Sequence, residues 1–160
     1  MTESPDALSL TTAEDQETLW VLADRVRFLG SLPGTAVVVA EVVVPPGAGT
    51  PLHSHASPEL FRVLSGAFDF LGLEDGRPTA RRAGPGDVLR VPPHVPHGYR
   101  NAGQTPATLL AVLDQAMAAF FRDLGAPPPM QGPPGPDDMA RIGAACARHG
   151  IAFVPMAEAA

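Results

Sequence analysis

Proline and glycine interrupt this chain at short intervals, and this punctuation limits the folds open to it more than any other feature. The chain has 19 prolines and 16 glycines, most of them between short apolar runs rather than in one tract. Proline lacks a backbone donor and glycine tolerates positive φ, so both mark turns and helix ends. Many short strands separated by turns are typical of a β-sandwich or β-barrel. The sequence therefore predicts an all-β fold.

The apolar runs between the turns predict the individual elements. Nine strands are expected at residues 20–22, 26–29, 36–44, 52–55, 59–64, 68–73, 87–91, 97–100 and 108–113. Beyond them, helices are expected at 114–124 and 137–149, joined by an extended proline-rich connector. The apolar stripe of the first helix either packs on the barrel or covers its mouth. We expect a flexible arm over 1–18, a barrel over 19–113 and a C-terminal extension over 114–160.

Charge and cysteine content exclude several classes of partner. The net charge is −6, and the longest basic run is the pair Arg81-Arg82, so neither nucleic acid nor an anionic membrane is an expected partner. The single cysteine, Cys146, has no partner for an internal disulfide, and it is not expected to be catalytic. The N-terminus is acidic where a signal peptide is basic and then apolar, and the apolar run at 36–44 is too short to span a bilayer. We expect a cytoplasmic protein.

The stretch HSHASPELF, at residues 53–61, carries the strongest chemical signal. Side chains alternate along a strand, so His53 and His55 point to the same face, roughly 7 Å apart along the backbone. The turn Ala56-Ser57-Pro58 returns Glu59 beside them. An HxH pair alone also occurs by chance, as two ordinary histidines on a strand. The spacing therefore suggests a metal site without establishing one.

A fourth ligand has to come from a distant part of the chain. His97, which opens a predicted strand after Pro92-Pro93, is the candidate. Three imidazoles and one carboxylate suit Fe, Mn, Co, Ni, Cu or Zn rather than Ca or Mg, which prefer oxygen ligands. We expect one divalent transition metal ion, of a kind that this ligand set does not specify.

Two longer stretches resemble the paired motifs of the cupin superfamily. PPGAGTPLHSHASPELFRVLSGAF places Gly47, His53, His55, Glu59 and Gly66 at the spacing of the first motif. GDVLRVPPHVPHGYRN places Gly86, Pro92, His97 and Asn101 at that of the second. One position departs, because His94 stands where the cupin pattern has glycine. His94 is either an extra polar group near the metal or an exposed loop residue.

The resemblance implies more than the spacing does. With the flanking segments WVLADRVRFLG and FFRDLGAPPP, the chain is similar to the small single-domain cupins of the quercetin-dioxygenase-like type. It implies a jelly-roll barrel, also called a double-stranded β-helix, and often a homodimer. Residue by residue, it assigns His53, His55, Glu59 and His97 as metal ligands. In such relatives the counterpart of Glu59 is thought to accept a proton from the substrate, which makes Glu59 the candidate catalytic residue.

The candidate substrate contacts are residues that lie on the same face of a strand as a ligand, because they are an even number of positions away from it. Phe61 and Val63 follow Glu59 on the inward face of one strand, and Tyr99 shares the face of His97. They either form an aromatic and apolar wall for a small organic substrate or simply fill the barrel. Glu41, within an apolar run, is either exposed or a buried acid that holds a ligand histidine. Four arginines either bind a substrate carboxylate or lie on the surface: Arg25, Arg27, Arg62 and Arg90.

Three functions remain open on the sequence alone. The first is a metal-dependent dioxygenase that acts on a small aromatic or enolisable molecule. The second is a redox-neutral metal enzyme, such as an isomerase, cyclase, decarboxylase or lyase. The third is a non-catalytic module that binds a small molecule. The fold hosts too many reactions to choose among them.

Overall fold

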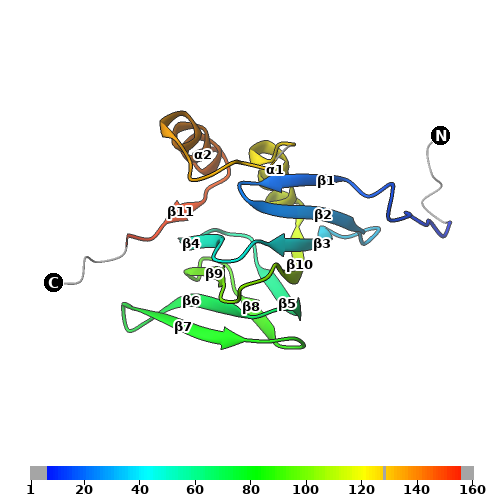
Figure 1. The fold of residues 1–160 in the computed structure, drawn as a ribbon. Coiled ribbons are helices and arrows are strands. Elements are labelled where there is room, and N and C mark those ends of the chain that lie inside the picture. The colour runs from blue at the N-terminus through cyan, green and yellow to red at the C-terminus, as the bar shows by residue number, and fades with distance from the viewer. Residues whose placement is uncertain (1–6, 128, 156–160) are drawn as a thin grey trace.

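Two antiparallel sheets pack face to face and enclose the core of the protein (Figure 1). The computed structural model describes residues 7–127 and 129–155. Within them lie β1 (Thr18–Val21), β2 (Asp24–Ser31), β3 (Val37–Val44), β4 (Gly49–Ser54), β5 (Glu59–Ser65), β6 (Phe68–Glu74), β7 (Arg77–Ala83), β8 (Val88–Val91), β9 (His97–Asn101), β10 (Ala107–Asp114), α1 (Gln115–Leu124), α2 (Pro136–Arg148) and β11 (Ala152–Phe153). Residues 1–6 and 156–160 of the two predicted terminal segments lie outside the described residues.

The order of the strands is that of a jelly roll. One sheet has the order β1-β2-β3-β10-β5-β8 and the other β11-β4-β9-β6-β7. From β3 to β6, and again from β8 to β10, consecutive strands alternate between the two sheets, so the chain winds around one core. The expected all-β jelly-roll barrel is confirmed.

Alternation within the strands explains where the core lies. In β3 and β10 every second residue is buried, as expected for strands with one face on the core. The largest side chains with almost no exposed surface are Phe68, Leu109, Val26, Val44, Val63 and Asn101. Asn101 is polar but fully satisfied, because its amide donates to the carbonyls of Val44 and Thr105 and accepts from the Gly103 N–H. This explains an asparagine at that point of the second motif.

Two strands were absent from the sequence prediction. β7 reads RPTARRA, and most of its residues are exposed, because it forms the edge of its sheet. It therefore lacks the apolar alternation that marks a half-buried strand. β11 has only two residues and pairs with β4, where Phe153 lies opposite His53. Its sequence signal is too short to separate from a loop.

The helices lie together at one end of the barrel (Figure 1). Asp114 ends β10 and caps α1 by accepting a hydrogen bond from the Met117 N–H. Arg141 of α2 donates to the carbonyl of Leu124 at 2.7 Å, and His149 contacts Asp123 at 2.9 Å. These contacts hold α2 against α1, and both helices face the interior described below.

Candidate metal centre

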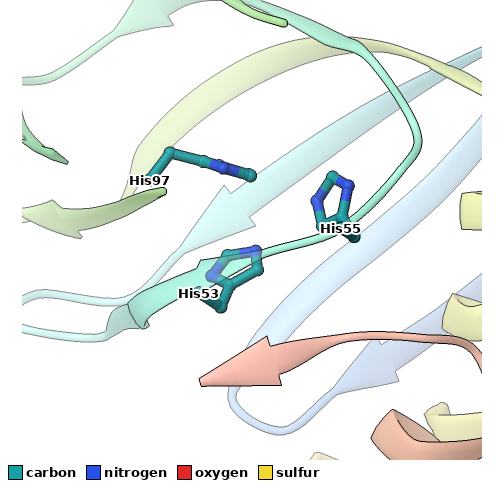
Figure 2. A group of neighbouring side chains, drawn as sticks. All are labelled: His53, His55 and His97. Carbon is teal, nitrogen blue, oxygen red and sulfur yellow. The ribbon is translucent and has the colours of Figure 1, made fainter. Parts of the chain in front are cut away.

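Three histidines from two neighbouring strands converge at one point of the barrel (Figure 2). His53 lies on β4, directly opposite His97 on β9, and His55 follows the end of β4. One nitrogen from each ring lies within 4.8 Å of the others. His55 and His97 are only 4% and 5% exposed, while His53 is half-buried. The three residues form a group that can hold a metal ion.

Backbone carbonyls orient all three rings in the same way. The Nδ1 atoms lie 2.8 Å, 2.9 Å and 2.8 Å from the carbonyl oxygens of Pro51, Ser57 and Val95, for His53, His55 and His97 respectively. A carbonyl only accepts, so each Nδ1 carries a proton, and each ring in its neutral form presents its Nε2 lone pair to the centre. Burial also lowers the pKa of His53 to about 4, which keeps that ring neutral at pH 7.

Glu59 closes the group from the start of β5. Its Oε2 lies 3.0 Å from His97 Nε2 and 3.5 Å from His55 Nε2. The turn before it is anchored by the Ser57 hydroxyl, which donates to Asp114 at 2.8 Å. Burial alone would raise the pKa of Glu59, but hydrogen bonds donated by His55 and His97, and their positive charge when they are protonated, outweigh burial and lower the pKa to about 2. The carboxylate is therefore ionised.

This arrangement fits a cation. A second proton, on Nε2, would let His55 and His97 donate to Glu59, whereas in their neutral form their Nε2 lone pairs face its carboxylate oxygens, so that acceptors face acceptors. His55 Nε2 is buried and has no hydrogen-bond partner among the described residues. Buried acceptors without a donor are costly unless a positive charge lies among them. A divalent ion would satisfy the lone pairs and balance the carboxylate.

His94, the departure from the motif, has strained backbone and an exposed side chain. Its φ is 65°, in the left-handed region that favours glycine, while its N–H donates to the His55 carbonyl at 2.7 Å. The backbone of the loop thus supports a ligand segment without help from the imidazole.

Replacing His94 with glycine is therefore expected to stabilise the protein by about 0.5–1 kcal/mol, the relief of left-handed strain less the entropy that glycine adds to the unfolded chain. Chemical denaturation measures the change. His94→Ala serves as the control, because it removes the imidazole but keeps the Cβ, and it should give no such gain. A lower stability for His94→Gly would contradict this explanation.

A cavity of about 470 Å³ extends from the histidines to the helices. His53, His97, Phe61 and Tyr99 line it, whereas Val63 lies in the core outside it with no exposed surface. The α1 stripe also lines it: Met117, Phe120, Phe121 and Leu124. The stripe was expected either to pack on the barrel or to cover its mouth, and it does both. Three of its residues are buried, and all four line the cavity.

Besides the histidines, three polar residues line this cavity, and the sequence predicted only one of them as a site residue. Asp24 begins β2, is 6% exposed and accepts a 2.7 Å hydrogen bond from the Tyr99 hydroxyl. Thr50 lies opposite Tyr99 on β4, and its Oγ1 is buried without a partner among the described residues. Tyr99 was predicted from parity. Asp24 and Thr50 have no local signal, because only the pairing of distant strands turns them inward.

Asp24 is expected to make stability fall as pH rises. Burial raises its pKa from 3.8 to about 6, although the Tyr99 hydrogen bond acts in the opposite direction. Between about pH 4 and pH 6 the folded state therefore binds a proton that the unfolded state has released. The raised pKa therefore adds on the order of 3 kcal/mol to the free energy of unfolding at low pH. This contribution is lost as the pH rises from about 4 to about 6.

Asp24→Asn isolates this effect, because asparagine cannot titrate but still accepts from Tyr99. The difference in unfolding free energy between the variant and the native chain, measured in urea from pH 4 to pH 8, should move in favour of the variant as pH rises. A difference that stays constant with pH would contradict the raised pKa.

Other candidate residues lie away from the cavity. Glu41 is half-buried in the middle of β3 and pairs with Arg27 across the sheet at 2.8 Å, so it does not contact a histidine of the centre. Arg62 is exposed, as alternation predicted. The residues that line the cavity within the described chain include no arginine, so Arg25 and Arg90 do not reach it either. Cys146 is buried on α2, and burial raises the pKa of its thiol.

Within the residues described, neither helix has the length and apolar character needed to cross a membrane.

Comparison with known proteins agrees with this geometry. The family model of the cupin domain matches residues 40–113. An uncharacterized protein of Methanocaldococcus jannaschii is 32% identical over 78 residues, a stretch that covers 48% of this chain and 59% of that relative. The chain thus spans somewhat over half the length of the curated relative it matches.

Solved structures show the same fold. An RmlC-like cupin from Shewanella frigidimarina has a TM-score of 0.58 at 22% identity, over 71% of this chain and 96% of that one. A variant of the oxalate decarboxylase of B. subtilis has a TM-score of 0.55 at 21% identity, over 69% of this chain and 31% of that one. A sugar phosphate isomerase of the cupin superfamily from Silicibacter pomeroyi has a TM-score of 0.50 at 28% identity, over 58% of this chain and 60% of that one. Residues 40–113 therefore match the cupin domain family, and the chain has the fold of these cupin structures.

Proposed function

We propose that this chain is a metal-dependent enzyme of the dioxygenase type that acts on a small aromatic or enolisable molecule. In this proposal His53, His55, Glu59 and His97 hold one divalent transition metal ion. The observation that carries it is the set of three imidazoles whose Nδ1 atoms are all committed to backbone carbonyls, so that the Nε2 atoms beside the Glu59 carboxylate are left for an ion. Such an ion supplies Lewis acidity and, when it is redox-active, electrons for dioxygen.

The surrounding residues have separate tasks in this proposal. Phe61 and Tyr99 give the ligand an apolar and aromatic wall beside the histidines. The Glu59 carboxylate, buried beside His55 and His97, accepts a proton from a substrate hydroxyl or enol. The helices α1 and α2 exclude water from the far end of the cavity.

Metal content and oxygen uptake test the proposal together. Protein purified without added metal is expected to carry about one transition metal ion per chain by elemental analysis. Samples loaded with Fe, Mn, Co or Ni are then offered flavonols and catechols under air. Oxygen consumption that matches substrate loss in at least one metal form supports the dioxygenase. No uptake in any of the four forms counts against it.

A redox-neutral reaction is the second candidate, and one likeness favours it. The cupin from Silicibacter pomeroyi that is called a sugar phosphate isomerase is 28% identical to this chain. The cavity, however, has no arginine among its described lining residues, and the chain contains no lysine, so a phosphate group would find no cationic side chain there. Turnover under strict anaerobiosis would decide for the redox-neutral reaction, because a dioxygenase stops without oxygen. A metal-loaded protein that binds ligands without any turnover would instead be a binding module.

A further inference from the structure

The cavity contains a second polar cluster that the metal ligands do not include. We propose that Asp24, Tyr99 and Thr50 form a binding site for a hydroxyl group of an uncharged, mainly apolar ligand. The inference rests on the proposed function only in taking the same cavity as the ligand site, and it concerns which molecules that cavity accepts.

Asp24 offers a hydrogen-bond acceptor inside an apolar enclosure. Its Oδ2 accepts from the Tyr99 hydroxyl at 2.7 Å, and the described residues supply no hydrogen bond to its Oδ1. Asp24 as a whole residue is 6% exposed, and it lines the cavity. Buried carboxyls normally have all their oxygens engaged, since an unmet acceptor costs free energy. A ligand hydroxyl that donates to Oδ1 would complete this set.

Thr50 supplies the second half of the site. It is paired with Tyr99 across β4 and β9, so both side chains lie on the same face of the sheet. Its Oγ1 is buried and has no partner among the described residues, although the residue lines the cavity. A hydroxyl can donate and accept, so Thr50 can bind the same ligand group that donates to Asp24. Thr50 thus adds an unsatisfied hydroxyl to the part of the cavity wall where Tyr99 donates to Asp24.

The charges around the cavity select an uncharged ligand. Asp24 and Glu59 are the acids near it, and no arginine lines it within the described chain. An anionic group at the Asp24 end would meet a carboxyl without a cation to balance it. The remaining lining is mostly aliphatic and aromatic, including Phe61, Phe120 and Leu124. A neutral alcohol or phenol with an apolar body fits these contacts, whereas a carboxylate or phosphate does not.

Binding of three matched naphthalenes tests the site. The probes are 2-naphthol, 2-methoxynaphthalene, which cannot donate, and 2-naphthoate, which is anionic. Isothermal titration calorimetry on the full chain, as purified and after chelation, should show 2-naphthol binding about tenfold more tightly than each of the others, as expected for one charge-assisted hydrogen bond. Because the preference should survive chelation, it is independent of the metal that the proposed function requires.

Three variants assign the preference to this cluster. Asp24→Asn and Thr50→Val should each reduce the preference for 2-naphthol to about twofold or less. His53→Ala should retain it, which excludes hydrogen bonding of the probe to His53 as the source of the preference. Thr108→Val is the matched control for Thr50, because Thr108 is a half-buried strand residue that does not line the cavity. Thr50→Val should also melt at the same temperature as the native chain or above it, since it removes a hydroxyl that has no partner.

Several results would overturn the proposal. These are equal affinity for 2-naphthol and its methyl ether, no binding of any probe up to 1 mM, or a preference that persists in Thr50→Val and Asp24→Asn but disappears in His53→Ala. The proposed function fails by a different result, the absence of bound metal or of metal-dependent turnover. The two failures are therefore distinguishable.

Discussion

His53→Ala is expected to lower the bound metal at least tenfold, from about one ion per chain to less than a tenth of an ion. Loss of a residue that merely orients a metal ligand typically costs 10–100-fold in affinity, and loss of a ligand should cost at least as much. His53 is the best position for this test because it is half-buried, whereas His55 and His97 are almost fully buried and their truncation would leave cavities. Elemental analysis and thermal melting with and without metal measure the effect.

The controls separate a ligand from a structural histidine. His94→Gly, in the same region but with an exposed side chain, should keep its full metal content. Added metal should raise the melting temperature of the native chain, because an ion that binds only the folded state stabilises it. His53→Ala should not respond to the same concentration. Glu59→Ala should lose metal as well, so unchanged metal content in both variants would refute the ligand assignment.

Gly49→Ala is expected to destabilise the protein by about 3 kcal/mol or more and to weaken metal binding as well. A Cβ at this position would overlap the carbonyl oxygen of Tyr99 and lie 2.8 Å from the Cα of Arg100. Those are backbone atoms of β9, so they cannot rotate away, and β4 would have to move. Because β4 carries His53 and β9 carries His97, separating the strands also separates the two imidazoles.

Gly143→Ala provides the comparison for this effect. Gly143 is exposed in the interior of α2, and a Cβ there would meet no described atom within 4 Å. Alanine should therefore stabilise the helix by up to about 1 kcal/mol and leave the metal content unchanged. Urea denaturation and elemental analysis of the two variants measure both effects. If Gly49→Ala folds as well as the native chain, the close approach of β4 and β9 is not as tight as described.

Local spacing explains why the histidine group was predictable. His53, His55 and Glu59 lie within seven residues, and the period of a strand with one turn is sufficient to bring their side chains together. His97 was predictable because the second motif has a fixed order of residues. The carbonyl partners of the three Nδ1 atoms were not, because these hydrogen bonds depend on how the backbone turns beside each histidine.

Other features had weak or absent signals for physical reasons. β7 escaped prediction because an exposed edge strand needs no apolar face. Val63 shares the parity of Phe61, yet it lies in the core and Phe61 borders the cavity, since parity states which face a residue occupies and not how far along the barrel the cavity extends.

By itself, the sequence determined the all-β architecture, the two helices and the residues that approach one another at the candidate metal centre. These follow from alternation, turn residues and short spacings, which act between near neighbours in the chain. The tertiary structure alone decided that Asp24, Thr50 and Tyr99 meet in one cavity and that α1 and α2 line its far end. Such contacts join strands and helices that are far apart in sequence, so their partners are set by packing around a common core and not by any local pattern.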